Sequence, residues 1–401
     1  MSANGHAVLG PSSAKRWLNC TASPHLIESI EIEEQTSAAA EEGTYCHAVM
    51  ESLILHNCRV AMSDDEKAAA IKDVLAVVKE GEDKYDVAEM QEHLDPLMQY
   101  LYQYQIQYSD LQIHVERRVD LHPVTQDVWG TADIILFSKI GDFIKVIDLK
   151  YGRVYVDEVN NWQMMLYFIG AMLSVLRGAP FPNTASIAIY QPRGGGEWHR
   201  QWHFGAPAIR EFVESTLKPG LEEHKRGGEF RVGEWCEWCP AIAHCGHMLA
   251  ATVDMATRSF EELDKIEDTE ELAKMLNLRK PVAKLMEHIE KRVTDLLTLG
   301  QEVPGYKLVE SNTKRKWGKP EEEIIAFLRT RGKLKLKDVQ VKKLITLTAA
   351  EKLVKNSKHI DVEDLQAYII KPAGSPTLAP ESDRRDALDM TGGGFEDLGP
   401  K

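Results

Sequence analysis

The chain has 401 residues, of which 43% are hydrophobic and 27% are charged, and its formal net charge is −14. This length and composition fit one large globular domain or two moderate ones. No apolar run approaches the roughly 18–20 residues that cross a bilayer. Residues 1–11 also lack the basic and then apolar pattern of a secretory signal, so we expect a cytoplasmic protein with no membrane partner.

Helical patterns dominate the first hundred residues. Pro11–Leu18 predicts a short helix that ends near Cys20. Ala38–His56 predicts a longer helix with one apolar side, and Asp64–Tyr108 predicts a further helical region rich in Tyr and Leu.

A β-sheet is predicted next, because apolar and polar residues begin to alternate. The predicted strands are Ile113–Val119, Gly130–Phe137, Phe143–Lys150 and Ala185–Gln191. The link at residues 139–142 suits a hairpin turn, and Asn160–Leu176 is helical. The order of helix, three strands, helix and strand predicts an α/β fold.

The remainder of the chain predicts a second region. From Asp254 onward the sequence is charged and mainly helical, with one expected strand at Tyr306–Glu310. Beyond Pro372 it is rich in Gly, Pro, Ser and Asp, which predicts a disordered tail. We therefore expect a domain at 1–250, a mainly helical accessory region at 251–372 and a tail at 373–401.

Part of the accessory region is basic although the whole chain is acidic. Residues 313–358 contain fourteen Lys or Arg against five Asp or Glu, a local balance of +9. A local basic patch matters more for contact with phosphates than the total charge does. A solvated helical face is the alternative interpretation of this segment.

Two carboxylates and a lysine are predicted to converge on the hairpin. Asp148 and Lys150 lie two residues apart on one strand and so point to the same face, and the hairpin can place Asp133 beside them. Such a group can hold Mg²⁺ or Mn²⁺ for phosphodiester hydrolysis, while the lysine orients or deprotonates the bound water and stabilises negative charge. The carbonyl of Leu149 would add a ligand. A solvated surface ion pair is the alternative, but the apolar flanks Val146 and Ile147 disfavour it.

Four short motifs resemble the RecB-type branch of the PD-(D/E)XK nuclease superfamily. They are Gly43-Thr44-Tyr45-Cys46-His47, Gly130-Thr131-Ala132-Asp133, Asp148-Leu149-Lys150 and Gln163-Met164-Met165-Leu166-Tyr167. The resemblance covers roughly residues 10–250. It implies a restriction-endonuclease-like core and a deoxyribonuclease activity that depends on Mg²⁺ or Mn²⁺.

The resemblance also implies a role for each motif residue. The metal ligands would be His47, Asp133, Asp148 and the Leu149 carbonyl, and the catalytic group would comprise Lys150, Asp148, Asp133, Glu116, Gln163 and Tyr167. Lys150 would be the catalytic lysine, and Glu116 would hold a second metal or orient water. Gln163 and Tyr167 lie one helical turn apart and would steady the lysine or contact a phosphate. In the alternative interpretation, Glu116 only pairs with the neighbouring arginines, and Gln163 and Tyr167 only cap the sheet.

The cysteines suggest a second metal site. Cys236, Cys239 and Cys245 lie within ten residues, and Cys20 is the natural fourth ligand. One cysteine before the core and three after it resembles the AddB-like and CRISPR-associated RecB-like exonucleases, where the four hold a [4Fe–4S] cluster. Zinc is the alternative, with His244 or His247 as a replacement ligand. Cys46 and Cys58 are expected to be buried structural residues.

The resemblance therefore implies a DNA exonuclease that acts on single-stranded or duplex ends in phage or bacterial recombination, repair or replication. A phage-encoded enzyme would work in the host cytoplasm, beside a recombinase or a single-strand-binding protein, and an oligomer is compatible with this role. Two other classes stay open. One is a non-cleaving adaptor that binds DNA ends or a partner, and the other is an iron–sulfur redox sensor.

Overall fold

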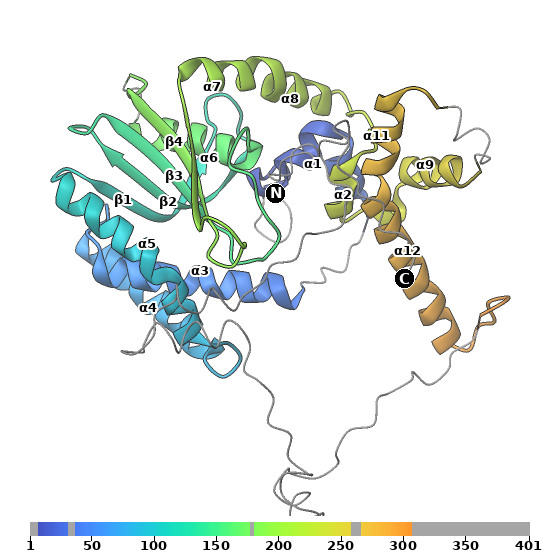
Figure 1. Ribbon diagram of the computed structural model, residues 1–401, viewed down its shortest axis with the longest axis horizontal. Helices are drawn as coiled ribbons and strands as arrows, with labels where there is room; N and C mark the ends of the chain where they lie inside the picture. The colour runs from blue at the N-terminus through green and yellow to red at the C-terminus, as the bar shows by residue number, and fades with distance from the viewer. Residues whose placement is uncertain (1–6, 31–36, 177–179, 258–265, 307–401) are drawn as a thin grey trace, which may run out of the picture. The chain divides into compact units, whose positions relative to one another are not determined.

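The computed structural model describes residues 7–30, 37–176, 180–257 and 266–306, all within one compact unit that spans Met1–Leu308. Its strands are β1 (Gln112–Asp120), β2 (Trp129–Ser138), β3 (Phe143–Leu149), β4 (Thr184–Tyr190) and β5 (His199–Phe204). Its α-helices are α1 (Ala14–Asn19), α2 (Ser23–Ser29), α3 (Ala38–Asn57), α4 (Asp64–Gly81), α5 (Val87–Gln107), α6 (Trp162–Ala171), α7 (Ala206–Phe212), α8 (Lys218–Lys225), α9 (Gly246–Thr257), α11 (Thr269–Asn277) and α12 (Arg279–Thr298). The mixed α/β architecture is the predicted one (Figure 1).

The five strands form one sheet in the order β1-β2-β3-β4-β5. Three neighbouring pairs are antiparallel, and only β3 and β4 run parallel. The connection between these two strands carries α6, as a parallel pair requires. The order of helix, three strands, helix and strand therefore appears in the described chain, followed by β5, which the sequence patterns did not predict.

Helices cover both faces of the sheet. On one face, α3, α4 and α5 pack against β1–β4 in one hydrophobic core (Figure 1). On the other face lies α6, in which every residue from Met164 to Ala171 is buried. A helix that is apolar all round needs partners on several sides, and α6 packs against the sheet in a second core and against α1 and α7 in a third.

Polar caps fix where the helices begin. Ser37 accepts a hydrogen bond from the Ala40 amide at the start of α3, and Asn161 does the same for Met164 in α6. Ser63 and Glu66 form a reciprocal capping box at the start of α4. The predicted helical region 64–108 is thus two helices, and the second starts at the Asp86 cap.

Strands β1 and β2 change the core into which they pack. In β1, Val115 belongs to the core below α3, whereas Val119 belongs to the core below α6. The two residues are four positions apart, so in a regular strand their side chains would lie on the same face of the sheet. Here they lie on opposite faces, which means that the alternation has shifted by one residue between them. The slip occurs at Glu116, whose φ of 45° is in the left-handed region. In β2, Ala132 packs in the core of α6 and Ile134 in the core of α3, so the same shift occurs on either side of Asp133.

The start of the chain is hydrogen-bonded to the segment after α8. The Ala22 amide donates to the Glu229 carbonyl, the Glu229 amide donates to the Thr21 hydroxyl, and that hydroxyl donates to Glu223. Gly228 has a φ of +73°, and an added Cβ would lie 2.4 Å from the Thr21 backbone. We call these contacts the Thr21 clasp.

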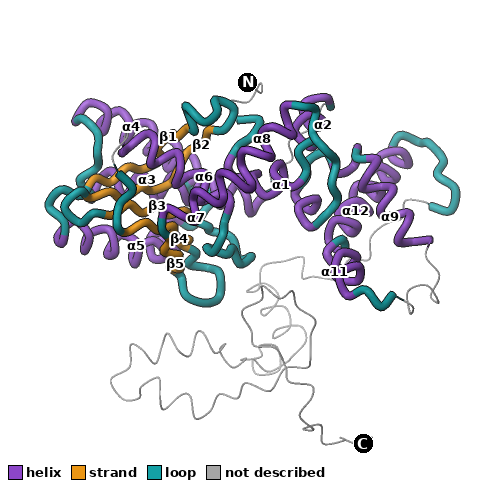
Figure 2. Tube along the Cα trace, turned by 90° about the horizontal axis from the view of Figure 1, so that it is seen from above, coloured by secondary structure: helices purple, strands orange, loops and turns teal. Residues whose placement is uncertain are grey.

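The end of the described chain is helical. The 3₁₀ segments Glu234–Trp238 and Ile242–His244 pack with α9 and α12 in a small core that includes Cys236, Met248 and Leu285. Figure 2 places α9, α11 and α12 beyond α1, α2 and α8, away from the sheet. The predicted helical character after residue 250 therefore holds as far as the description reaches.

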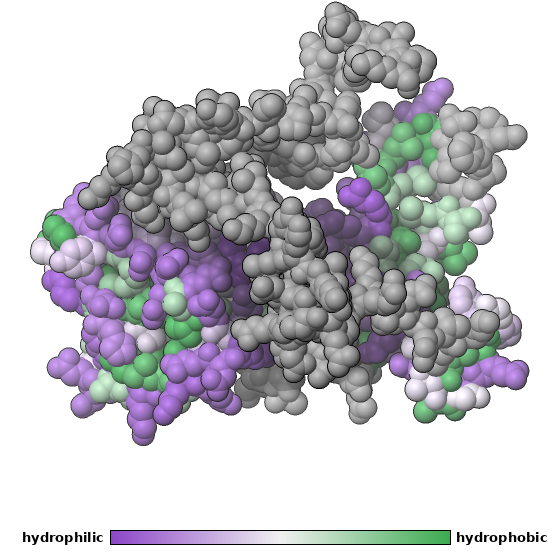
Figure 3. All heavy atoms as spheres, turned by 60° about the horizontal axis from the view of Figure 1, so that its bottom comes forward, coloured by the Kyte–Doolittle hydropathy of each residue, from purple (hydrophilic) through white to green (hydrophobic). Residues whose placement is uncertain are grey.

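Three predictions lie wholly or mainly outside the described residues: the strand at Tyr306–Glu310, the basic segment 313–358 and the tail 373–401. The domain boundary near 250 stays a prediction. Among the described helices, none is long and apolar enough to cross a membrane. Hydrophilic side chains cover much of the described surface in Figure 3, with smaller hydrophobic patches between them.

Candidate metal centre

Three carboxylates lie in one row across β1, β2 and β3. Val115 pairs with Ile134 and Arg117 with Ala132, so Glu116 faces Asp133. Ile134 pairs with Ile147, and the same register continued by one residue sets Asp133 opposite Asp148. Like charges directly opposite each other destabilise a sheet. The row therefore requires a cation or protonation.

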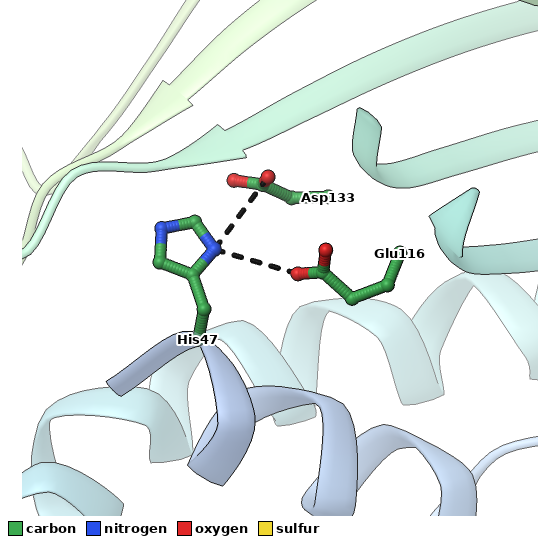
Figure 4. Close-up of side chains that lie close together, drawn as sticks. All are labelled: His47, Glu116 and Asp133. Carbon is green, nitrogen blue, oxygen red and sulfur yellow. Dashed lines mark hydrogen bonds and ion pairs between the residues drawn. The ribbon is translucent and has the colours of Figure 1, made fainter. Parts of the chain in front are cut away.

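His47 supplies the fourth group from α3 (Figure 4). Its Nδ1 lies 3.4 Å from Glu116 Oε1 and 3.5 Å from Asp133 Oδ1. Within the described part of the chain, these three residues are the one group of three or more ligand-type side chains whose atoms all lie within 4.8 Å of one another. An imidazole and carboxylates are ligands that Mn²⁺ and Mg²⁺ accept.

Helix α3 holds His47 at the margin of the core. Its neighbours Cys46, Val49 and Met50 are buried against the sheet, while His47 keeps 30% of its side chain exposed. Burial alone lowers the pKa of His47, but Asp133, Glu116 and Asp148 outweigh it and raise that pKa to about 9. Without a metal, protonated His47 is thus the cation between Asp133 and Glu116, and a divalent ion would replace its proton.

The carboxylates repel one another because they lie close together. Burial, then the charge of Asp148, raises the pKa of Asp133 to about 8 despite nearby His47. Glu51, one turn after His47 on α3, has a pKa raised to about 7 by burial and then by Glu116. Both carboxyls are therefore costly to ionise unless positive charge is added.

Asp148, Lys150 and Gln163 form the other half of the site. Lys150 Nζ lies 2.9 Å from Asp148 Oδ2, and Gln163 Nε2 donates to Asp148 Oδ1 at 2.9 Å. Lys150 also donates to Gln163 Oε1 at 3.3 Å. Burial lowers the pKa of Lys150, but Asp148 and Asp133 outweigh burial and raise it. Lys150 is therefore an ammonium group held between a carboxylate and an amide.

Tyr167 and the end of β3 complete the surroundings. Burial, then Asp148 and Asp133, raises the pKa of Tyr167, so its phenol stays protonated. The Leu149 amide donates to Asp133 Oδ2 at 2.6 Å, which fixes that carboxylate and places the Leu149 backbone beside it. All the predicted site residues of this half are thus brought together, and their roles stay predictions.

The four predicted cysteines line one cavity. Cys20 directly follows α1, Cys236 lies in the first 3₁₀ segment, and Cys239 and Cys245 each directly follow a 3₁₀ segment. Arg16 and His247 also line the cavity, whereas Cys46 and Cys58 are buried in the core below α3. Burial raises the pKa of Cys236 to about 11 and raises that of Cys239 as well. These thiols would therefore need a metal to become thiolates.

Some residues at these sites were not identified from the sequence. Arg16 lines the cysteine cavity, and no motif in the sequence marks it. Trp129, at the start of β2, lines a groove next to Tyr167 and stacks with Arg118 at 3.9 Å. Only the position of Trp129 directly before the Gly130 motif could have indicated it.

A comparison with protein families places the chain. The model of the family described as "Protein of unknown function (DUF2800)" matches residues 6–386, nearly the whole sequence. The chain belongs to this DUF2800 family. The solved structure described as "Crystal structure of SSO0001" is 13% identical to the DUF2800 chain, covering 56% of it and 95% of the other chain. Its TM-score of 0.23 does not assign the two chains to one fold.

Proposed function

We propose that this DUF2800 protein is a deoxyribonuclease of the PD-(D/E)XK class, similar to the RecB-like branch, that depends on Mg²⁺ or Mn²⁺. The observation that carries the proposal is the row Glu116, Asp133 and Asp148, flanked by His47 and Lys150. Oxygen ligands, one imidazole and one ammonium group gathered across three neighbouring strands suit phosphodiester hydrolysis. The proposed substrate is DNA, attacked from an end.

The residues divide into two groups by role. His47, Asp133 and Glu116 would hold the metal ion, with Asp148 and the Leu149 carbonyl on its other side. Bound there, Mg²⁺ or Mn²⁺ would neutralise phosphate charge and lower the pKa of water. The repulsion within the carboxylate row supports this fit, because a divalent cation removes it.

Lys150 acts on the phosphate rather than as a base. Its raised pKa keeps it protonated, so it donates hydrogen bonds to the negative charge that develops on the phosphate oxygens. Asp148 and Gln163 hold its Nζ in place at 2.9 and 3.3 Å. Tyr167, also protonated, is a second donor at this position.

The test is cleavage of end-labelled linear DNA in Mn²⁺ or Mg²⁺, with chelator as the blank. Lys150→Ala should slow cleavage by at least about a hundredfold, the usual loss for one transition-state donor. Lys139→Ala is the matched control, because Lys139 is an exposed lysine at the turn of the same hairpin. Equal activity of both variants would remove Lys150 from the site. A wild-type protein that binds DNA ends without cutting would favour the non-cleaving adaptor.

We also propose that Cys20, Cys236, Cys239 and Cys245 hold a [4Fe–4S] cluster rather than zinc. The three close cysteines and the distant Cys20 line one cavity, and their spacing is similar to that of the iron–sulfur exonucleases rather than to the two close pairs of a zinc ribbon. A visible band near 400 nm and iron analysis test this assignment; zinc in a colourless protein would contradict it.

A further inference from the structure

A groove opens beside the candidate metal centre, on the side of Tyr167. Its volume is about 490 Å³, within the range of about 300–1,000 Å³ that small-molecule sites occupy. Its lining comes from residues 7–13, from α1 and α2, from the start of β2 and from α6: Ala7, Val8, Gly10, Pro11, Ser12, Ser13, Arg16, Pro24, Ile27, Glu28, Trp129, Gly130, Thr131 and Tyr167.

The groove and the metal centre share a strand and a helix. Gly130 and Thr131 of the groove precede Asp133 on β2, and Tyr167 of the groove lies one helical turn after Gln163 on α6. Gly130 forms part of the wall, and a Cβ there would lie 3.0 Å from both Pro11 and Tyr167. A chain bound at the carboxylates would therefore enter this groove next.

Aromatic and basic side chains stand together on its β2 wall. The Trp129 ring lines the groove and carries the Arg118 guanidinium 3.9 Å from its centroid. Arg118 is exposed to solvent. Ser12 and Ser13 add hydroxyl groups to the lining, against one carboxylate from Glu28, and Arg16 also lines the groove while its guanidinium donates to Ser23.

We propose that this groove binds the nucleotides next to the scissile phosphate of single-stranded DNA, with a base stacked on Trp129. An aromatic ring beside an arginine is a combination that binds single strands without sequence preference. An internal base of a duplex has both faces covered by its neighbours, so it cannot stack on Trp129 until the strands separate. The inference rests on the proposed nuclease function and specifies its substrate.

The test measures binding of a fluorescein-labelled oligothymidylate by anisotropy, in a Lys150→Ala background that leaves the DNA uncut. Trp129→Leu keeps an apolar side chain but removes the stacking face, and Trp129→Phe restores an aromatic ring. We expect about tenfold weaker binding for Leu and near wild-type binding for Phe. Tyr102→Ala is the control, because Tyr102 is a 61% exposed aromatic residue on α5 outside the groove.

The outcomes separate the two proposals. Equal binding by the Leu and Phe variants, in a protein that cuts DNA, would overturn the groove assignment and leave the nuclease standing. Tighter binding of blunt duplex than of single strand would also overturn it. A wild-type protein that neither binds nor cuts any DNA would overturn the proposed function and this inference together. Thermal unfolding of each variant verifies that the fold is retained.

Discussion

Replacing Asp133 with Asn removes one charge from the middle of the carboxylate row and keeps the shape of the side chain. The amide oxygen can still accept the Leu149 hydrogen bond of 2.6 Å. In the wild type, the pKa of Asp133 is raised from 3.8 to about 8, and a tenfold change in a proton-binding constant corresponds to about 1.4 kcal/mol. Ionising Asp133 in the folded protein is therefore costly, but Glu116 and Asp148 share this repulsion and relax when it is removed. We expect Asp133→Asn to stabilise the metal-free protein by about 1–3 kcal/mol at pH 8.

The sign of the pH dependence follows from the raised pKa. Below pH 3.8, the ordinary pKa of an aspartate, Asp133 is protonated in both the folded and the unfolded protein and costs no stability. As the pH rises towards about 8, the unfolded chain ionises Asp133 more easily than the folded protein does, so stability is lost. The variant has no such loss, so its advantage should be small at pH 5 and largest at pH 8. For a protein of this size, about 2 °C per kcal/mol predicts a Tm increase of roughly 2–6 °C at pH 8.

Metal should remove most or all of the variant's stability advantage. Mn²⁺ at a hundredfold excess over its Kd stabilises a folded site by about 2.7 kcal/mol, and the variant should lose most of this gain. Thermal unfolding in chelator and in Mn²⁺, at pH 5 and pH 8, measures all four cases. Asp110→Asn is the control, because the Asp110 carboxylate accepts bonds from Ser138 and two backbone amides and has a lowered pKa; this variant should be destabilised. An Asp133→Asn protein less stable than wild type in chelator at pH 8 would refute the repulsion argument.

Two further predictions concern the cysteine cavity and the Thr21 clasp. Cys239→Ser should remove the absorbance near 400 nm and lower the Tm. Cys58→Ser is the control and should keep the colour, because Cys58 lies in the core between α3 and the sheet. A coloured Cys239→Ser protein would exclude Cys239 as a ligand. Gly228→Ala should destabilise the protein by about 2 kcal/mol or more in denaturant unfolding, because a Cβ would clash with the Thr21 backbone at a φ of +73°. Gly227→Ala is the control, because Gly227 has a φ of +105° but open space around it. The difference between the two variants separates the cost of the clash from that of the backbone strain.

The hairpin was predictable because each of its signals is local. The short apolar run at residues 143–149, the turn at 139–142 and the apolar α6 are all visible in a few residues at a time. The resemblance, in turn, indicated the candidate residues His47, Glu116, Asp133, Asp148 and Lys150, and the structure brings them together.

The parts that could not be predicted depend on long-range packing. Strand β5 reads His-Arg-Gln-Trp-His-Phe and lies at a sheet edge with most of its residues partly exposed, so it has no clear apolar face. The left-handed Glu116 is invisible in the sequence, because Gly or Asn would be the expected residue there. The slip at Glu116 results from two cores that the sequence does not delimit, and the groove at Trp129 forms only when the start of the chain packs against β2.

The Thr21 clasp also has a consequence for how fast the protein folds and unfolds. It joins residues up to 208 positions apart in the sequence, and closing so long a loop costs chain entropy that only later contacts repay. We expect such contacts to form after the rate-limiting step of folding. Weakening the clasp should therefore speed unfolding and leave the refolding rate nearly unchanged. We therefore expect the contacts between Thr21 and residues 223–229 to govern the lifetime of the folded state rather than the speed of reaching it.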